Sequence, residues 1–313
     1  MRLTRPALLS SALALGLALA ACDDPVAAHT APATAGAPAS APAASGDDPW
    51  LADVSAMVQA DAGAGRRVAI QHRLDALGIA WRDVPFKIDE ESGTNVWADV
   101  AGAPEAPLLL LGAHSDQVAQ GEGATDNASG SATVLALAQR LKARPLQRHR
   151  VAVAFWDLEE KGLLGSKAFV AATGSPKPAL YVNFDVFGWG DTVWLMTPQA
   201  DSALAQATGT AVQAQGLKLS AGDKYPPTDH LPFLKAGWPA VSYSLVGGDE
   251  IALILDMYAG RKPGAVPKVM QVIHSDHDTL ANIDPAAVAR GVDAVEAALR
   301  AWDAQPVAQT GMP

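Results

Sequence analysis

Histidine and carboxylate residues follow several apolar runs in this sequence, and these residue types are typical of metal-dependent hydrolysis. The clearest case is Leu108–Gly112, which is followed almost at once by His114 and Asp116. Polar groups at the carboxyl ends of strands in an open α/β sheet usually serve a site. Histidine, aspartate and glutamate ligands without cysteine suit a hydrolytic zinc centre. The residues of this kind are His114, Asp116, Asp126, Glu159, Glu160, Asp185 and His274.

The carboxylates in this set would repel one another if the fold brings them together. Gathering Asp126, Glu159, Glu160 and Asp185 without positive charge is costly, because neighbouring like charges and burial both disfavour ionised carboxylates. Two divalent metal ions would neutralise the group. A single aspartate or glutamate is ordinarily solvated, so the interpretation rests on the whole set.

Alternating strand-like and helix-like segments position these residues. Apolar or alternating runs indicate strands at Trp81–Ile88, Thr94–Val100, Leu108–Gly112, Val151–Trp156, Leu180–Phe184, Thr192–Met196 and Ala240–Ser244. Helical spacing follows Pro49 and recurs at Gly65–Leu77, Ala128–Leu141, Leu163–Ala172, Ser202–Gln215, His230–Lys235, Ile251–Tyr258 and from about Pro285 to Trp302. This alternation predicts an α/β fold, a three-layer sandwich in which helices flank a mixed, largely parallel sheet.

The composition limits the class of protein. With 313 residues, 49% of them hydrophobic and 18% charged, the chain has an ordinary globular composition. A net charge of −10 argues against nucleic acid as a partner, which requires a basic surface. We expect one folded domain over residues 49–304, preceded by a disordered Ala/Pro-rich tether at 22–48 and followed by a flexible tail at 305–313.

The N-terminus has the pattern of an export signal. A basic start, Met1–Arg5, precedes an apolar run from Ala7 to Ala21, which is too short to span a bilayer as a mature helix but fits a signal peptide. Leu19–Cys22 resembles the bacterial lipobox, which implies removal of residues 1–21 and lipidation of Cys22. We therefore expect a bacterial envelope protein, held at a membrane by lipid on Cys22 and facing the periplasm. The alternative is a secreted protein in which Cys22 is incidental.

Five motifs together resemble those of one enzyme family, in the family's order. They are Gly112–Asp116, Asp126–Gly130, Glu159–Ser166, Asn183–Asp185 and His274–Thr279. The family is the co-catalytic dinuclear zinc aminopeptidases of the bacterial leucyl aminopeptidase, aminopeptidase S and aminopeptidase Y type, which has glutaminyl cyclase relatives. The resemblance covers about Trp50 to Trp302 and implies the zinc exopeptidase fold.

The resemblance also implies a ligand set for two zinc ions per chain. Asp126 would bridge the two ions. His114 and Asp185 would complete the shell of one ion, and Glu160 and His274 that of the other. His277 is the alternative to His274, but the spacing to the following Asp-Thr pair favours His274.

Other residues receive supporting roles from the same resemblance. Glu159 would be the general base, and Asp116 would hold His114 through its second ring nitrogen. Asp278 would act in the same way near His274. The family also predicts a cis peptide bond after Asp126.

Substrate contacts are less defined. His230 lies in a segment that resembles one packed near the substrate in this family, and a structural role for it is as well supported as a catalytic one. Several members carry a tyrosine directly before the last histidine ligand, where this chain has Ile273. Tyr243, Tyr225 or Tyr258 could substitute. His72 and His149 are expected to be solvated.

The leading functional hypothesis is an aminopeptidase that releases N-terminal residues from peptide substrates. The nearest alternative is a glutaminyl-peptide cyclotransferase of the same superfamily, which uses one zinc ion. Retention of both His114 and Asp185 favours the two-metal peptidase. A third reading is an inactive zinc-fold binding module, against which the complete ligand set argues.

Overall fold

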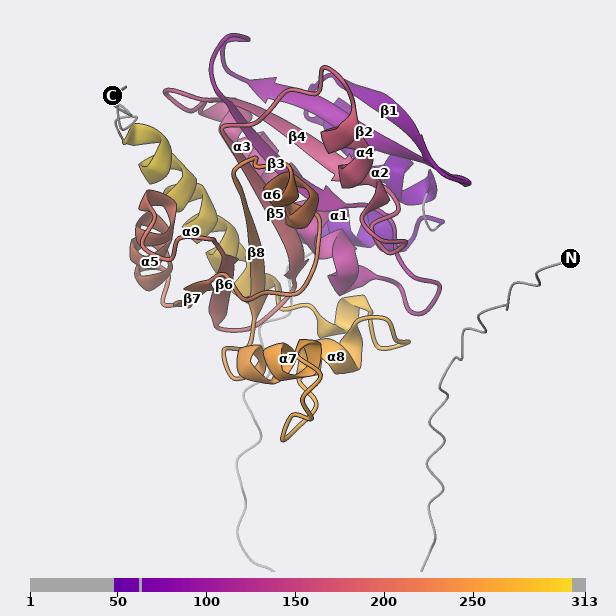
Figure 1. Ribbon diagram of the computed structural model, residues 1–313, viewed down its shortest axis with the longest axis vertical. Helices are drawn as coiled ribbons and strands as arrows, with labels where there is room; N and C mark the ends of the chain where they lie inside the picture. Colours follow the sequence, from indigo (N-terminus) through magenta and orange to yellow (C-terminus); the bar gives the residue numbers. More distant parts are fainter. Residues whose placement is uncertain (1–47, 62–63, 306–313) are drawn as a thin grey trace, which may run out of the picture. The chain divides into compact units, whose positions relative to one another are not determined.

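The computed structural model describes residues 48–61 and 64–305 (Figure 1). Within that part of the chain, none of the helices has both the length and the apolar character needed to cross a membrane. The signal peptide, the lipidated Cys22 and nearly all of the tether and tail lie outside the described residues, so those expectations stay predictions.

A mixed sheet forms the middle of the fold, with strand order β1-β2-β4-β3-β5-β8-β6-β7. Its strands are β1 (Trp81–Ile88), β2 (Glu91–Ala101), β3 (Leu108–His114), β4 (Arg150–Trp156), β5 (Leu180–Phe187), β6 (Thr192–Met196), β7 (Lys218–Gly222) and β8 (Ala240–Val246). The four central strands β4, β3, β5 and β8 run parallel, whereas β1, β2 and β6 join through antiparallel pairings.

Helices cover both faces of this sheet, as predicted for a three-layer sandwich. They are α1 (Pro49–Val58), α2 (Ala64–Ala76), η1 (Ala124–Ala128), α3 (Ser129–Ala143), α4 (Leu164–Ala171), α5 (Ala203–Ala214), α6 (His230–Lys235), α7 (Glu250–Tyr258), α8 (Lys268–Val272), η2 (Leu280–Asn282) and α9 (Pro285–Ala304). In Figure 1, α4 and α6 lie in front of the sheet and α3 lies behind it.

Alternation along β3 explains how one strand serves two cores. Leu109 and Leu111 belong to the core cluster that also contains residues of α1, α2, α3, α5 and α9, whereas Leu108 and Leu110 belong to the cluster with aromatic residues of α4 and α6. Successive side chains of a strand point to opposite faces, so a continuous run of leucines is what a strand covered on both sides requires. The predicted fold class is therefore confirmed.

Several boundaries differ from the predictions. The turn between β1 and β2 is only Asp89–Glu90, with Asp89 in the left-handed region at φ 53°, so β2 begins three residues earlier than expected. β5 continues past Asp185 to Phe187 through a shift in its pairing with β8. The periodicity also missed α8 and the short π-helical turn η1, which are too short to produce a clear apolar repeat.

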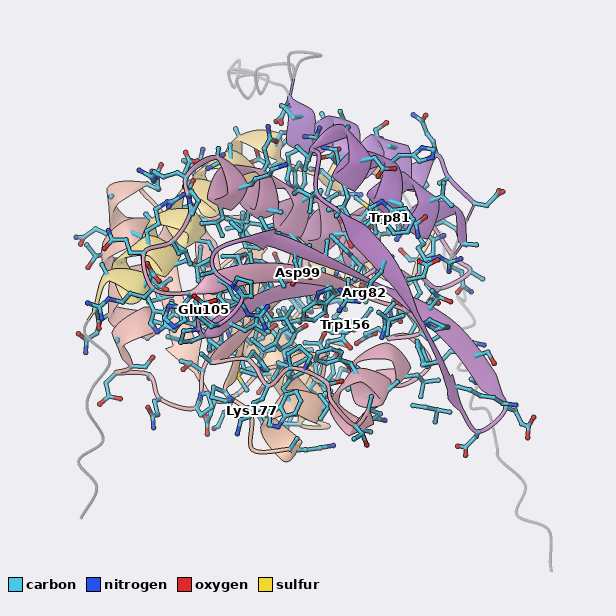
Figure 2. All side chains as sticks on the ribbon, turned by 90° about the horizontal axis from the view of Figure 1, so that it is seen from above. Trp81, Arg82, Asp99, Glu105, Trp156 and Lys177 are labelled. Carbon is cyan, nitrogen blue, oxygen red and sulfur yellow. The ribbon has the colours of Figure 1, made fainter. Side chains whose placement is uncertain are left out.

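The open edge of the sheet is blunted by its own side chains. Arg82 of β1 and Asp99 of β2 form an ion pair of 3.4 Å on this edge, which Figure 2 shows from above. Arg82 also lies 5.3 Å from the ring centre of Trp97, and Pro85 interrupts the hydrogen-bonding capacity of β1. Charges and proline on an edge strand disfavour pairing with a second chain.

His149 was predicted to be solvated, but its side chain is largely buried. It lies at the end of the central strands opposite to the predicted site. Its Nδ1 lies 2.8 Å from Asp303 of α9, and its ring stacks on Trp302 with the ring centres 4.4 Å apart. Asp303 also accepts hydrogen bonds from the backbone N–H groups of residues 147–149. This aspartate therefore ties the last turn of the final helix to the chain entering β4.

Candidate active site

The predicted metal ligands come from separate elements and converge at the carboxyl end of the parallel strands. His114 is the last residue of β3, Asp126 lies in η1, and Asp185 lies near the end of β5. Glu160 follows β4 and His274 follows α8, where His274 adopts a left-handed φ of 56°. Adjacent parallel strands end at one edge of a sheet, which is why residues so far apart in sequence meet there.

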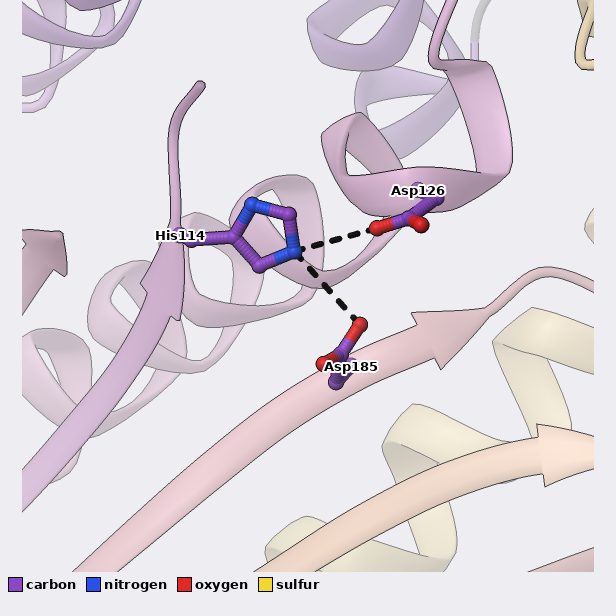
Figure 3. A group of neighbouring side chains, drawn as sticks. All are labelled: His114, Asp126 and Asp185. Carbon is purple, nitrogen blue, oxygen red and sulfur yellow. Dashed lines mark ion pairs between the residues drawn. The ribbon is translucent and has the colours of Figure 1, made fainter. Parts of the chain in front are cut away.

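Asp126 joins the two halves of this cluster. One of its carboxylate oxygens lies 3.0 Å from Nε2 of His114, and the other lies 3.1 Å from Nε2 of His274. Nε2 of His114 also lies 3.6 Å from Asp185, and Nε2 of His274 lies 3.1 Å from Glu160. Figure 3 shows the first of these two groups, with both carboxylates directed at the same ring nitrogen.

The spacing and chemistry of these groups fit divalent metal ions. Ligand atoms at about 2.0–2.2 Å from a tetrahedral zinc ion lie roughly 3.3–3.6 Å from one another. The contacts of 3.0–3.6 Å within the two groups match that edge length. In addition, Oε1 of Glu160 is buried without a hydrogen-bond partner in the described part of the structure, which is costly for an ionised oxygen.

Glu159 stands beside the ligands but bonds to neither histidine-carboxylate group. Its carboxylate comes within 4.8 Å of ligand atoms of His114 and Glu160. Burial raises the pKa of Glu159 to about 10, opposed by the charge of His114 and reinforced by Asp229, Asp185 and Asp126. Without added positive charge, Glu159 is therefore the carboxyl group of this cluster that favours its protonated form.

The two histidines of the cluster have raised pKa values, because carboxylates surround them. Hydrogen bonds to Asp126 and Glu160 raise the pKa of His274 to about 10. Burial lowers the pKa of His114, but the charge of Glu159 and the contacts with Asp116 and Asp126 outweigh it, so the pKa lies well above the ordinary value. In the absence of metal ions, protonated His114 and His274 thus supply the positive charge that balances the carboxylates.

Asp116 contacts His114 as predicted and also has partners that the sequence did not reveal. Its Oδ1 lies 3.4 Å from Nδ1 of His114, and its backbone carbonyl lies 3.3 Å from the same nitrogen. The same carboxylate accepts hydrogen bonds from the backbone N–H groups of Glu159 at 3.0 Å and Glu160 at 3.1 Å. One carboxylate therefore positions a histidine of one strand end and two glutamates of the next.

The predicted role of Asp278 beside His274 is wrong. Its two oxygens instead accept hydrogen bonds from the backbone N–H groups of Thr125, at 2.6 Å, and Asp126, at 3.1 Å. Its own carbonyl accepts from the backbone of Glu122 at 2.8 Å. Asp278 thus fixes the segment that carries Asp126. The peptide bond between Asp126 and Asn127 is cis, as predicted.

The three candidate tyrosines are placed very differently. A pocket surrounds the predicted ligands. Tyr243 does not line it, because this residue is buried in the core, where its hydroxyl bonds to Thr208 at 2.7 Å. Tyr225 reaches the pocket, but its hydroxyl is bonded to Ser244. Tyr258 of α7 also lines the pocket and is 52% exposed.

His230 is buried directly behind this pocket. Its ring packs edge-on against Tyr225 at 5.7 Å, and burial lowers its pKa to about 4. Its Nδ1 has no partner within the described residues. The imidazole of His230 is therefore enclosed and neutral.

The pocket itself combines the polar cluster with an apolar wall. It is open to solvent and has a cavity volume of about 110 Å³. The polar side contains His114, Asp126, Glu159, Glu160, Asp185 and His274. The apolar wall comprises Trp194, Val246, Ile254, Val269, Met270 and Ile273. A molecule bound there would contact both the histidines and carboxylates and these hydrophobic side chains.

Comparisons with known proteins agree with this picture. The family model described as peptidase family M28 matches residues 95–299. The leupeptin-inactivating enzyme 1 of Streptomyces exfoliatus is 31% identical over 75% of this chain and 55% of its own length. A probable leucine aminopeptidase 2 of Trichophyton verrucosum is 30% identical over 62% of this chain and 41% of its own. The chain thus spans about half the length of these curated relatives.

A shorter match and two solved structures extend the comparison. The probable lipoprotein aminopeptidase LpqL of Mycobacterium tuberculosis is 34% identical over 39% of this chain and 25% of its own. The LapA aminopeptidase of Legionella pneumophila has a TM-score of 0.63 and 17% identity, covering 82% of this chain and 70% of its own. The glutaminyl cyclase of Porphyromonas gingivalis has a TM-score of 0.62 and 19% identity, covering 82% and 96%. The two structures share the fold of this chain.

The matched region contains every predicted metal ligand, together with Glu159 and Asp116. The family model covers well over half of the chain, and its position agrees with the motifs from which the resemblance was inferred. This protein belongs to peptidase family M28.

Proposed function

We propose that this protein is a zinc-dependent aminopeptidase that hydrolyses the first peptide bond of peptides with a hydrophobic N-terminal residue. The observation that carries the proposal is the position of Asp126, whose two carboxylate oxygens each face a different histidine-carboxylate group. One group holds His114 and Asp185, and the other holds His274 and Glu160. Such an arrangement suits two ions that share one bridging carboxylate.

These groups and the neighbouring Glu159 would divide the chemistry between them. When bound, two zinc ions would acidify a water molecule and polarise the carbonyl of the bond to be cleaved. Glu159, which lies beside the ligands without bonding to either group, would accept the proton of the attacking water and deliver it to the leaving amine. Asp116 would keep Glu159 and Glu160 in place through their backbone N–H groups.

Tyr258 is the tyrosine best placed to assist the reacting carbonyl. Tyr258 lines the same pocket as the carboxylate cluster. Burial raises the pKa of its phenol, and the charges of Asp185, Asp126, Glu159 and Glu160 raise it further. A neutral phenol in that position could donate a hydrogen bond to a developing oxyanion. Tyr258 would then take the role of the tyrosine that several family members carry at the position of Ile273.

The apolar wall supports the proposed substrate preference. Aliphatic and aromatic side chains beside the metal ligands would bury a hydrophobic N-terminal side chain and reject a charged one. The names of the curated relatives, which include leucine aminopeptidases and a leupeptin-inactivating enzyme, agree with this preference.

The decisive experiment replaces Glu159 by glutamine and measures zinc content and turnover together. Glutamine preserves the size of the side chain but cannot accept the proton. We expect two zinc ions per chain to be retained and hydrolysis of leucyl nitroanilide to fall by about 10²–10⁴-fold. A variant that hydrolyses this substrate at the wild-type rate would show that Glu159 is not the base.

A second candidate is glutaminyl-peptide cyclisation, which is favoured by one observation. The structural match spans 96% of the Porphyromonas gingivalis glutaminyl cyclase but only 70% of the LapA aminopeptidase. The two activities can be separated by incubating the purified protein with a glutaminyl peptide and a leucyl peptide. One zinc ion per chain with pyroglutamate formation would favour the cyclase, whereas two ions with release of leucine would favour the aminopeptidase.

We also propose that the enzyme is held at the cell envelope by lipid on Cys22. The lipobox-like sequence Leu19–Cys22 supports this assignment. The similarity to a protein named a probable lipoprotein aminopeptidase agrees with it.

A further inference from the structure

An arginine is buried beneath the segment that carries Asp126. Arg66 of α2 is only 1% exposed, and its Nη2 donates hydrogen bonds to the carbonyls of Glu122 at 2.6 Å and Gly123 at 2.7 Å. Its Nε and Nη1 are buried without a hydrogen-bond partner among the residues that the structure describes. An arginine enclosed in this way, with two of its nitrogens unbonded, is costly unless its charge is compensated.

The compensating charges belong to the candidate active site. Burial lowers the pKa of Arg66 to about 10, and the charges of Asp278, Asp126, Asp116 and Glu160 oppose that effect. These carboxylates act on the guanidinium through their charge and not through hydrogen bonds. Arg66 therefore remains protonated at neutral pH, and its contact with Gly123 holds this charge at the start of the segment that carries Asp126.

We propose that Arg66 is a counter-cation of the metal site, that is, a fixed positive charge that partly neutralises the carboxylate cluster. It stabilises the metal-free cluster and therefore weakens the binding of zinc. The inference rests on the metal site of the proposed function. Because zinc ions would neutralise the same carboxylates, Arg66 loses its attractive partners when they bind and is left close to added positive charge. The two hydrogen bonds to the Asp126 segment persist in both states.

The proposal predicts that Arg66 stabilises the metal-free protein more than the zinc-loaded protein. A residue with only a structural role would not produce this difference in stability. A residue that only ties the loop to α2 would stabilise both forms equally. A counter-cation stabilises the metal-free form more. By thermodynamic linkage, removing its charge must then increase the stabilisation that zinc provides.

The experiment compares melting temperatures of wild type, Arg66→Met and Arg66→Lys in excess chelator and in excess zinc. Methionine removes the charge, whereas lysine retains it but cannot form both carbonyl bonds with the same geometry. Arg67→Met is the matched control, because Arg67 is the next residue of α2 and pairs with Asp83 at 4.0 Å instead of facing the site.

We expect the zinc-induced rise in melting temperature to be larger for Arg66→Met than for wild type by about 4 °C or more. Competition with a chromophoric chelator should show zinc bound about 10-fold more tightly by the folded variant. Arg66→Lys and Arg67→Met should keep the wild-type rise. An equal or smaller rise in Arg66→Met would overturn the inference. If wild type itself shows no rise with zinc, the metal site fails, and the inference fails with it.

Discussion

Asp116 provides the sharpest test of how the site is held together, because its carboxylate serves two neighbouring strand ends at once. Replacing it by asparagine keeps the shape but leaves only one acceptor oxygen. The amide nitrogen would then face either the N–H of Glu159 or that of Glu160, which now donate at 3.0 and 3.1 Å. It would also remove the charge 3.4 Å from Nδ1 of His114.

The size of the effect follows from the bonds that are lost. A hydrogen bond from a backbone N–H to a buried carboxylate is worth about 1.5–3 kcal/mol. If that free energy is lost from the arrangement that binds metal, zinc affinity falls roughly 10- to 150-fold, since each 1.4 kcal/mol is a factor of ten. Changes to residues that support metal ligands commonly cost about 10–100-fold, which agrees with this range.

The assay is competition for zinc with a chromophoric chelator, combined with kcat for leucyl nitroanilide at saturating zinc. Asp157→Asn is the control, because Asp157 also accepts two backbone N–H groups, from Thr94 and Leu158, yet contacts none of the proposed ligands. We expect weaker zinc binding only in Asp116→Asn. Wild-type zinc affinity in that variant would refute the view that Asp116 positions the ligands.

Three further predictions test other parts of the structure. Tyr258→Phe should lower kcat about 10- to 100-fold with little change in KM, whereas Tyr243→Phe, whose hydroxyl bonds to Thr208 in the core, should leave both constants unchanged. Asp303→Asn should be destabilised by about 1–2 kcal/mol at pH 7 in urea unfolding. Burial opposes ionisation of Asp303, but His149 and backbone N–H groups lower its pKa, so the difference from wild type should persist above about pH 4 and shrink as the pH falls through the lowered pKa. Cys22→Ala should move the protein from the membrane fraction to the soluble fraction of cells that export it, and retention in the membrane would contradict lipid anchoring.

The fold class and the position of the site were predictable because their signals are local. Apolar runs indicated the central strands, with His114 and Asp185 at or near the carboxyl ends of two of them and Asp126 just before a helix. The motif order then connected these residues to one family. Each of these inferences uses side-chain type and spacing, which are read directly from sequence.

The supporting interactions were not predictable, because their partners are backbone atoms. Asp278 was expected beside His274 but binds the N–H groups of Thr125 and Asp126. Arg66 gave no signal at all, since its partners are the carbonyls of Glu122 and Gly123. Every residue carries such groups, so a sequence does not reveal which of them a side chain will meet. The burial of His149 was missed for a related reason, because its partner Asp303 lies 154 positions away.

The bond between Asp278 and the backbone of Asp126 also determines when the enzyme can first act. These residues are 152 positions apart, and His274 reaches Asp126 from the same late segment. Contacts across such a separation form late in folding, because a long loop must close before they are gained. A chain growing from its N-terminus therefore lacks a complete site until the segment that carries His274 and Asp278 has been made. On the proposed function, the nascent protein cannot cleave peptides before that segment has joined the fold.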